Sequence, residues 1–529
     1  MRVINSQDMQ EIEAKCVESY GFSASLIIEN LGPRGADWIS DELLQDKSYG
    51  EIMVLVGAGN NGADGLSIAR QLVNRGHRVR AFVLFPEELK SAELKQQILM
   101  AENFGVKVDP AKKIEQLSSY FAQTQNEFLV IDAIFGTGVR LPVSDYLFDI
   151  FNLVNQYASV MVSIDMPSGI CSNTGRKEGS AIYADYTLAI GLPKVGHYME
   201  AGLQHTGDLL VLDAGFPTEI LQGGSTSVLT VDSFKDLFSK RNKFAHKNSF
   251  GHTLVVAGSF GLTGAAAMAA EAALKVGTGL VTAVTWQENY QELQAAVINE
   301  VMTGVIPISE LDKQAEISRF NRYDCIVVGP GLGRSAGARD VVLGILQNFA
   351  GPIVIDADAL NCLSLQEDRT LLSERKAPTI LTPHIGEFAR FIDVPKEKLL
   401  KNPLGYLKEL VESLNSTIVM KGSCTYLGFP DGQIYINHFP NDGMASGGTG
   451  DVLAGMIGGL LAQTTPQLKE HGIFRENSRF YAAVRCAVYA HTLAGKYAVD
   501  SNGARAMTAK SIIENFAAAF LEIENETQE

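Results

Sequence analysis

The stretch EIMVLVGAGNNGADG, residues 51–65, determines how the first half of the chain folds. Residues 51–56 form a short apolar run, which is typical of a strand buried on both faces of a parallel sheet. The run ends in glycines, and residues 66–75 then show a helical pattern. The stretch therefore predicts a strand, a tight turn and a helix in immediate succession.

Similar units follow along the chain. Residues 5–45 have a helical pattern, residues 79–85 form a second apolar run, and FLVIDAIFGTG (128–138) and SVMVSIDMPSG (159–169) are two more runs that end in turns. Strands that alternate with helices indicate βαβ crossovers and a parallel sheet. Ligands bind such sheets at the carboxyl ends of the strands, where all these polar turns fall.

A second α/β series begins after a less ordered, small-residue segment. Its predicted strands are residues 253–258, 325–331, 352–360, 379–384 and 417–423, and its long helices begin near residues 451 and 481. We predict an α/β protein of two domains, residues 1–217 and 241–529, joined by a linker at 218–240.

The overall composition limits the possible functions. The chain has 529 residues, 46% of them hydrophobic, and a net charge of −16. No basic cluster favours nucleic acid, and no apolar stretch approaches the 18 residues of a membrane span. Six widely spaced cysteines without a C-x-x-C pair favour reduced thiols. We expect a cytoplasmic homo-oligomer that acts on small molecules.

The turn GAGNNGADG (57–65) has the G-x-G-x-x-G pattern of dinucleotide sites but differs from a simple hydride-transfer site. Asn60, Asn61 and Asp64 put polar groups where such turns are apolar, and the next strand ends without the acid expected to bind a ribose. Asp132 and Asp165 precede two further turns. Together these oxygens could coordinate a cation, or each residue could simply cap its own helix or turn.

The motifs GNNGADG (59–65), DAIFGTG (132–138) and DMPSG (165–169) resemble the N-terminal domain of YjeF-type proteins, the NAD(P)H-hydrate epimerases, over residues 1–217. The resemblance implies a Rossmann-like three-layer sandwich. It implies a K⁺ site at Asn61, Asp132 and Ser168. It implies that hydrated NAD(P)H is bound by Asn60, Asn61, Gly62, Ala63, Asp64, Gly136, Thr137, Gly138, Val139, Arg140, Leu141, Pro142 and Asp165. From its chemistry we infer that Asp165 is the catalytic proton shuttle. Ala63 departs from a usual glycine, and its methyl would crowd a backbone with positive φ.

The second half contains NDGMASGGTGD (441–451), followed directly by a helical stretch. Its glycines leave the N–H groups at the helix start uncovered, as an anion site requires. Asp451 opens the first turn, where it could also be a favourable N-terminal carboxylate. Neither a Walker sequence nor its lysine is present. We interpret Asp451 as catalytic.

GGTGD resembles the anion hole of ribokinase-like enzymes, and further motifs resemble one narrower family, the ADP-dependent NAD(P)H-hydrate dehydratases, over about residues 241–520. They are HKNSFGH (246–252), GLTGAAAMAAEAALKVGTGLVT (261–282), GPGLG (329–333), VIDADALN (354–361), TPHIGE (382–387) and MKGSCT (420–425). The resemblance implies a ribokinase-like three-layer sandwich that uses ADP and Mg²⁺.

Carried over to this chain, the resemblance implies two sets of contacts. ADP would be bound by Lys421, Gly422, Ser423, Cys424, Thr425 and Gly450. The hydrate would be bound by Ala265, Gly333, His384 and Asp451. Asn248 replaces a usual glycine, Asp442 replaces a proline, and Ile385 replaces a proline, which would loosen the turn that holds His384.

Two alternatives stay open at this level. The first half could be a nucleotide-binding module without catalytic activity, and the second could be a ribokinase-like small-molecule kinase. The fusion favours nicotinamide nucleotide repair, because a dehydratase that accepts the S epimer needs the R epimer converted. The expected products are NAD(P)H, AMP and phosphate.

Overall fold

The computed structural model describes residues 1–45, 47, 49–89, 91–123, 127–237, 241–306, 319–363, 366–471 and 478–527. The chain divides into two compact units. One is Arg2–Thr226, the N-terminal domain, and the other is Ser227–Glu529 with Met1, the C-terminal domain. The division falls within residues 218–240, the segment predicted as a linker. In the structure its described part contains α8 (Thr218–Leu221) and β8 (Thr226–Val228).

The N-terminal domain is built around a seven-stranded parallel sheet in the order β3-β2-β1-β4-β5-β6-β7, counted over the described residues. The strands are β1 (Ile52–Val56), β2 (Val79–Val83), β3 (Lys107–Pro110), β4 (Phe128–Ala133), β5 (Ala158–Ile164), β6 (Tyr186–Ile190) and β7 (Asp208–Leu212). The chain builds outward from β1 to β3 and returns to the other side at β4. The carboxyl ends of β1 and β4 therefore form the switch point where such sheets bind ligands.

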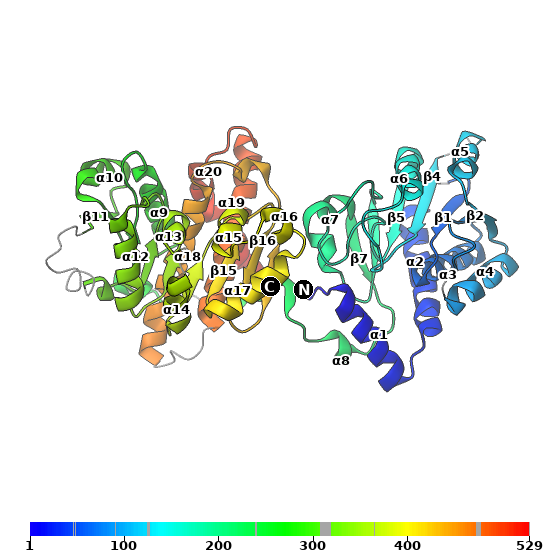
Figure 1. Cartoon of the computed structure of the whole chain (residues 1–529), viewed down its shortest axis with the longest axis horizontal. Helices are drawn as coiled ribbons and strands as arrows, with labels where there is room; N and C mark the ends of the chain where they lie inside the picture. The colour runs from blue at the N-terminus through cyan, green and yellow to red at the C-terminus, as the bar shows by residue number, and fades with distance from the viewer. Residues whose placement is uncertain are drawn as a thin grey trace. The chain divides into compact units, whose positions relative to one another are not determined.

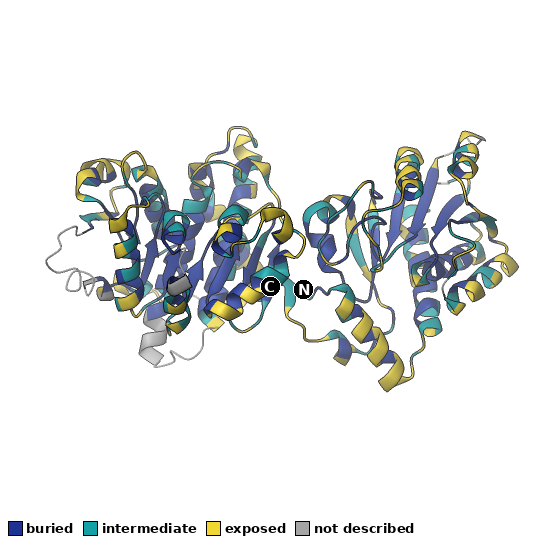
Figure 2. Cartoon of the chain, in the orientation of Figure 1, coloured by how far each residue is buried: buried dark blue, intermediate teal, exposed yellow. Residues whose placement is uncertain are grey.

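Helices cover both faces of this sheet (Figure 1). They are α1 (Ser6–Tyr20), α2 (Ala24–Leu43), α3 (Asn60–Asn74), α4 (Ala92–Asn103), α5 (Ile114–Gln123), α6 (Asp145–Tyr157) and α7 (Glu200–His205). Alternate residues of β1 face opposite layers. Val54 packs in one core with Leu66 of α3, whereas Leu55 packs in another with Phe151 of α6. The central strands β1 and β4 are buried along their whole length, as their apolar runs predict (Figure 2).

The C-terminal domain has a ten-stranded sheet in the order β11-β10-β9-β12-β13-β14-β15-β16-β17-β8 among the described residues. The strands are β9 (His252–Val256), β10 (Leu280–Thr285), β11 (Met302–Val305), β12 (Cys325–Val328), β13 (Ile353–Ile355), β14 (Thr379–Leu381), β15 (Thr417–Met420), β16 (Thr425–Gly428) and β17 (Ile434–Asn437). Neighbours from β11 to β15 are parallel, and the β15–β16 and β16–β17 pairs are antiparallel.

The helices of this domain also form two layers around the sheet. They are α9 (Thr263–Lys275), α10 (Tyr290–Ala296), α12 (Ala336–Asn348), α13 (Ala357–Cys362), α14 (Gln366–Glu374), α15 (Ile385–Phe391), α16 (Lys396–Leu399), α17 (Pro403–Leu414), α18 (Thr449–His471), α19 (Ser478–Asn502), α20 (Ala509–Glu514) and α21 (Phe516–Glu526). Val255 and Val327 of the sheet pack in one core with α9, α18 and α19. None of the helices in the described part of the chain is long and apolar enough to span a bilayer.

The predicted fold class, two α/β domains around parallel sheets, is confirmed. The long helices begin at Thr449 and Ser478, near the predicted positions. The predicted strands run past the observed ones, because their last residues form the turns that carry the polar groups. Residues 357–360, predicted as strand, begin α13 instead, with Asp356 as its N-cap.

Candidate functional sites

The turn after β1 packs tightly on the turn after β4. A Cβ atom at Gly57 would lie 1.9 Å from the carbonyl oxygen of Ile134, so this position requires glycine. Helix α3 then begins at Asn60, with Gly59 as its N-cap. Ala63 lies buried inside α3 and is not among the residues with positive φ, so its methyl does not meet the condition for crowding.

Asn61 and Asp64 occupy the first turns of α3 without a hydrogen-bond partner among the described residues. Both polar atoms of the Asn61 side chain are buried and unpaired. Asp64 is buried, and this burial, together with the carboxylates of Asp165 and Glu13, raises its pKa well above the usual value. Unpaired polar groups of this kind are costly in a fold. They mark a place where a ligand can supply the missing partners.

Asp132 and Ser168 join the turns after β4 and β5. The Asp132 carboxylate accepts hydrogen bonds from the Ser168 hydroxyl (2.6 Å), the Ser168 N–H (2.8 Å), the Ser163 hydroxyl (2.8 Å) and the Ile134 N–H (3.2 Å). The Ser168 hydroxyl also accepts from the Phe135 N–H at 2.9 Å. Two of the three predicted K⁺ ligands are therefore bonded to each other.

Asp165, which follows β5, is held on almost every side. It has a positive φ of 69°, a conformation that a non-glycine residue adopts only when its surroundings enforce it. Its N–H donates to Leu188, and its carbonyl oxygen accepts from His197 Nε2 at 2.9 Å. Its Oδ1 accepts from the Ile190 N–H (3.2 Å) and from the Lys194 ammonium.

Reasoning from the sequence missed Lys194 and His197. The Lys194 side chain is completely buried, and it also donates to the Ile190 carbonyl oxygen at 2.9 Å. His197 Nδ1 accepts from the Lys194 N–H, so the ring is neutral, and burial lowers its pKa to about 4. The only available signal was a lysine and a histidine within the otherwise apolar stretch LPKVGHYM (192–199).

The glycine turn at 136–138 adjoins both Asn61 and Asp165. A Cβ atom at Gly136 would lie 2.8 Å from Asp165 Oδ2 and 3.4 Å from Asn61 Oδ1. The structure thus brings together one predicted site residue from each of the three N-terminal motifs, Asn61, Gly136 and Asp165, at the switch point of the sheet. At the far end of the predicted 136–142 segment, Arg140 is exposed to solvent.

In the C-terminal domain, Asp451 lies at the uncovered start of α18. Among the described residues, the N–H groups of Thr449, Gly450 and Asp451 meet no acceptor, and a Cβ at Gly447 would meet open space. The Asp451 side chain is partly exposed rather than packed away. Burial, reinforced by the charge of Asp356, raises its pKa to about 7. A carboxylate with this pKa can act as a base near neutral pH.

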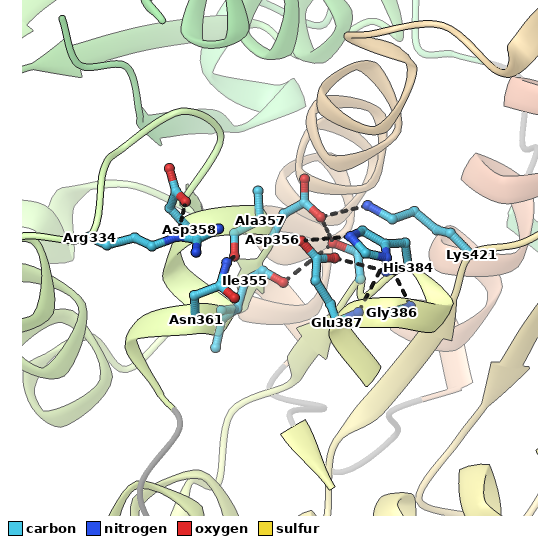
Figure 3. A network of polar contacts seen from close by, with 11 residues as sticks. Arg334, Ile355, Asp356, Ala357, Asp358, Asn361, His384, Gly386, Glu387 and Lys421 are labelled. Atoms are coloured by element: carbon cyan, nitrogen blue, oxygen red, sulfur yellow. Dashed lines mark hydrogen bonds and ion pairs between the residues drawn. The ribbon is translucent and has the colours of Figure 1, made fainter. Parts of the chain in front are cut away.

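Lys421, at the end of β15, lies beside the same helix start. Its ammonium donates to Asp356 Oδ1 at 2.7 Å (Figure 3). The Thr382 hydroxyl donates to the same oxygen at 2.7 Å. A Cβ at Gly450 would lie 3.1 Å from Lys421 Nζ. Asp356 was inside a recognised motif but was given no role from the sequence. In the predicted ADP segment, Cys424 is buried.

His384 is exposed at the N-cap of α15. Its Nδ1 accepts from the N–H groups of Gly386 (3.0 Å) and Glu387 (3.2 Å), which leaves the proton on Nε2 (Figure 3). The Ile385 N–H donates to the Lys421 carbonyl oxygen at 3.1 Å, a bond that proline cannot make. Ile385 therefore ties this turn to β15, and the predicted loosening was wrong.

The remaining predicted contacts line the neighbouring strand ends. The Gly333 N–H donates to Asp358 Oδ2 at 3.0 Å, and Arg334 pairs with Asp358 Oδ1 at 2.9 Å. Ala265 lies in the first turn of α9 next to Gly331, where a Cβ would lie 3.2 Å from the Ala265 Cβ. Asn248 precedes β9 in a short 3-10 helix (Lys247–Phe250) and so lies at the opposite, amino end of that strand. Its departure from glycine does not touch the candidate site.

Comparison with known proteins supports the family resemblance predicted for each half of the chain. A family model described as NAD(P)H-hydrate dehydratase matches residues 253–517, and one described as YjeF-related protein N-terminus matches residues 20–196. The bifunctional NAD(P)H-hydrate repair enzyme Nnr of Moorella thermoacetica is 32% identical, over 100% of this chain and 98% of the relative. Its counterpart from Thermofilum pendens is 30% identical, over 97% of this chain and 95% of the relative.

Among solved structures, the ADP/ATP-dependent NAD(P)H-hydrate dehydratase from Bacillus subtilis, co-crystallised with ATP and Mg²⁺, is 28% identical. The match covers 56% of this chain and 98% of that one, with a TM-score of 0.47. The relatives match this chain nearly from end to end, and both resemblances predicted from the motifs are confirmed. The chain belongs to the family of bifunctional NAD(P)H-hydrate repair enzymes.

Proposed function

We propose that the N-terminal domain interconverts the R and S epimers of hydrated NAD(P)H and that the C-terminal domain dehydrates the S epimer at the expense of ADP. One observation supports the dehydratase activity of the C-terminal domain. Asp451, with a pKa of about 7, stands beside uncovered N–H groups at the start of a long helix. This arrangement places a base next to a phosphate-binding site.

In the dehydration step Asp451 removes the proton from the C6 hydroxyl of the hydrate. The C6 oxygen attacks the terminal phosphoryl group of ADP, and AMP leaves. The C6–O bond then breaks with the help of the ring nitrogen, phosphate departs, and loss of a C5 proton restores the dihydropyridine. Lys421 and the N–H groups of α18 stabilise the charge on the transferred phosphoryl group.

The residues present fit a nucleotide accompanied by Mg²⁺. The described part of the chain contains no cluster of three His, Cys, Asp or Glu placed to hold a metal ion alone. Mg²⁺ commonly binds through one or two carboxylates plus substrate phosphates. Asp356 and Asp358 are the carboxylates whose charges reach Asp451. The bound ion would neutralise charge on the phosphates.

For epimerisation, Asp165 exchanges a proton with the C6 oxygen while that oxygen leaves and returns on the other face. The buried, unpaired amide of Asn61 supports a ligand at this point, either the hydrate or the proposed K⁺. Ser168 and Asp132 offer only the lone pairs that their mutual hydrogen bonds leave free. Replacing K⁺ by tetramethylammonium tests the ion, and we expect slower epimerisation with unchanged dehydration of the S epimer.

The test of the whole proposal is to incubate the full chain with mixed hydrate epimers, ADP and Mg²⁺. The absorbance of the reduced nicotinamide should return to the value for complete conversion. Conversion that stops at the S fraction contradicts an active first domain. A stable phosphorylated product without NAD(P)H contradicts the dehydratase and points to a kinase.

A further inference from the structure

Asp165 has one carboxylate oxygen fixed and one left open. Oδ1 receives the Lys194 ammonium and the Ile190 N–H. Among the described residues no donor reaches Oδ2, which lies 2.8 Å from where a Cβ at Gly136 would stand. The backbone N–H and carbonyl of Asp165 are also bonded, which fixes the main chain, and the carboxylate cannot turn without breaking the two Oδ1 contacts.

Lys194 is itself fixed on both sides. Its ammonium bridges Asp165 and the Ile190 carbonyl oxygen, and its side chain is completely buried. Its N–H is bonded to the neutral His197 ring, and the backbone beside it is paired with Ile4 of the N-terminal segment. A lysine buried this completely is rare unless it is paired. Here the partner is Asp165, and no part of the side chain reaches solvent.

From this geometry we infer that Lys194 is a positioning residue of the epimerase, which binds Asp165 Oδ1 and directs Oδ2 toward the substrate. The inference rests on the proposed epimerase function. It assigns to Lys194 no direct contact with the hydrate.

The charges around Asp165 make Lys194 important for a further reason. Glu13 of α1 and Asp64 of α3 are acidic groups whose charges reach Asp165, and His197 is neutral. Lys194 is therefore the one cation among the described groups that face this carboxylate. A buried carboxylate that loses its opposite charge becomes harder to ionise, by roughly 1–3 pH units.

The test follows epimerisation of the pure R hydrate by the full chain without ADP, from pH 6 to 9, with the protein-free rate subtracted. We compare the wild type with Lys194→Met, with Lys194→Gln and with a control, Lys107→Met. Gln keeps a donor but carries no charge, and Lys107 is an exposed lysine of β3 in the same domain. Dehydration of the S hydrate, measured separately with ADP, is the internal reference.

We expect Lys107→Met to behave like the wild type. In Lys194→Met kcat should fall about 100-fold at pH 7 with little change in KM, and Lys194→Gln, whose amide can still donate to Oδ1, should keep more of the activity. A rise in pH should restore only part of the rate in both variants, because it favours the ionised carboxylate but does not return Oδ2 to its place. No loss in Lys194→Met, an equal loss in both variants or a full recovery at high pH overturns the inference, as does a Lys194→Gln protein whose N-terminal domain fails to fold. A wild type without epimerase activity contradicts the proposed function instead.

Discussion

The two sites use the same kinds of group but pair them differently. In the N-terminal domain the buried lysine, Lys194, binds the reactive carboxylate itself. In the C-terminal domain Lys421 binds Asp356, and Asp451 has no direct ionic partner in the described part of the chain and a pKa of about 7. The lysine of the first site therefore pairs with the reactive carboxylate, whereas the lysine of the second pairs with a neighbouring carboxylate and leaves the reactive one with a raised pKa.

Exchange of each carboxylate for its amide separates the two activities and has the largest expected effect. Asp451→Asn should lower kcat of S-hydrate dehydration about 10³-fold, since it removes the base, and should leave epimerisation intact. Asp165→Asn should do the reverse. Rates of NAD(P)H formation and of R-to-S conversion check both. Loss of both activities in either variant would contradict the assignment of one activity to each domain.

Removal of each lysine compares the two ion pairs as structural elements. The Lys194 side chain is fully buried, whereas that of Lys421 is 20% exposed. Lys194→Met should lower the free energy of unfolding of its domain by about 3–5 kcal/mol, because it leaves a buried carboxylate unpaired. Lys421→Met should cost about 1–3 kcal/mol. Urea unfolding of the full chain measures both, and equal losses would show that burial does not distinguish the pairs.

The charges around Asp451 predict pH shifts of opposite sign. Asp356 raises the pKa of Asp451 and Lys421 lowers it. In Asp356→Asn the rise of dehydratase activity with pH should therefore move to lower pH, by about one unit, and in Lys421→Met to higher pH. Shifts in the same direction would contradict the proposed network. The nearby control is His384→Asn, which should not move this rise.

Ile385→Pro has the smallest expected effect. It removes a hydrogen bond worth about 1 kcal/mol to the Lys421 carbonyl oxygen. It also stiffens the first position of α15, where proline is favourable, by about 0.4–1 kcal/mol. Stability and the KM for the hydrate should change little. A several-fold change in KM would show that this turn places His384 more strictly than its exposure indicates.

Much of the fold was predictable because its central strands are short apolar runs that end in glycine turns. β1, β4, β9 and β12 were found in this way. β3 escaped prediction because its residues, KVDP, are largely exposed at the sheet edge and have no apolar pattern. The predicted homo-oligomer and the cytoplasmic location stay predictions.

The site was predictable where chemistry lies within a local motif and not where it depends on tertiary pairing. Asp451 is adjacent in sequence to the glycines that leave its helix start uncovered, so the site around it could be predicted from this one motif. Lys194 and Asp165 are 29 residues apart, and Lys421 and Asp356 are 65 apart. Nothing local distinguishes such a lysine from a solvated one, and only the fold reveals the pair.

The most direct test of the central claim is the pH dependence of S-hydrate dehydration in a single turnover with saturating ADP and Mg²⁺. If Asp451 is the base, its ionised form is active, and the rate should rise through an apparent pKa near 7. The rise should disappear in Asp451→Asn, whatever residual rate that variant keeps. A wild-type rate that is flat from pH 5.5 to 8.5, or a rise that survives in Asp451→Asn, would contradict the account.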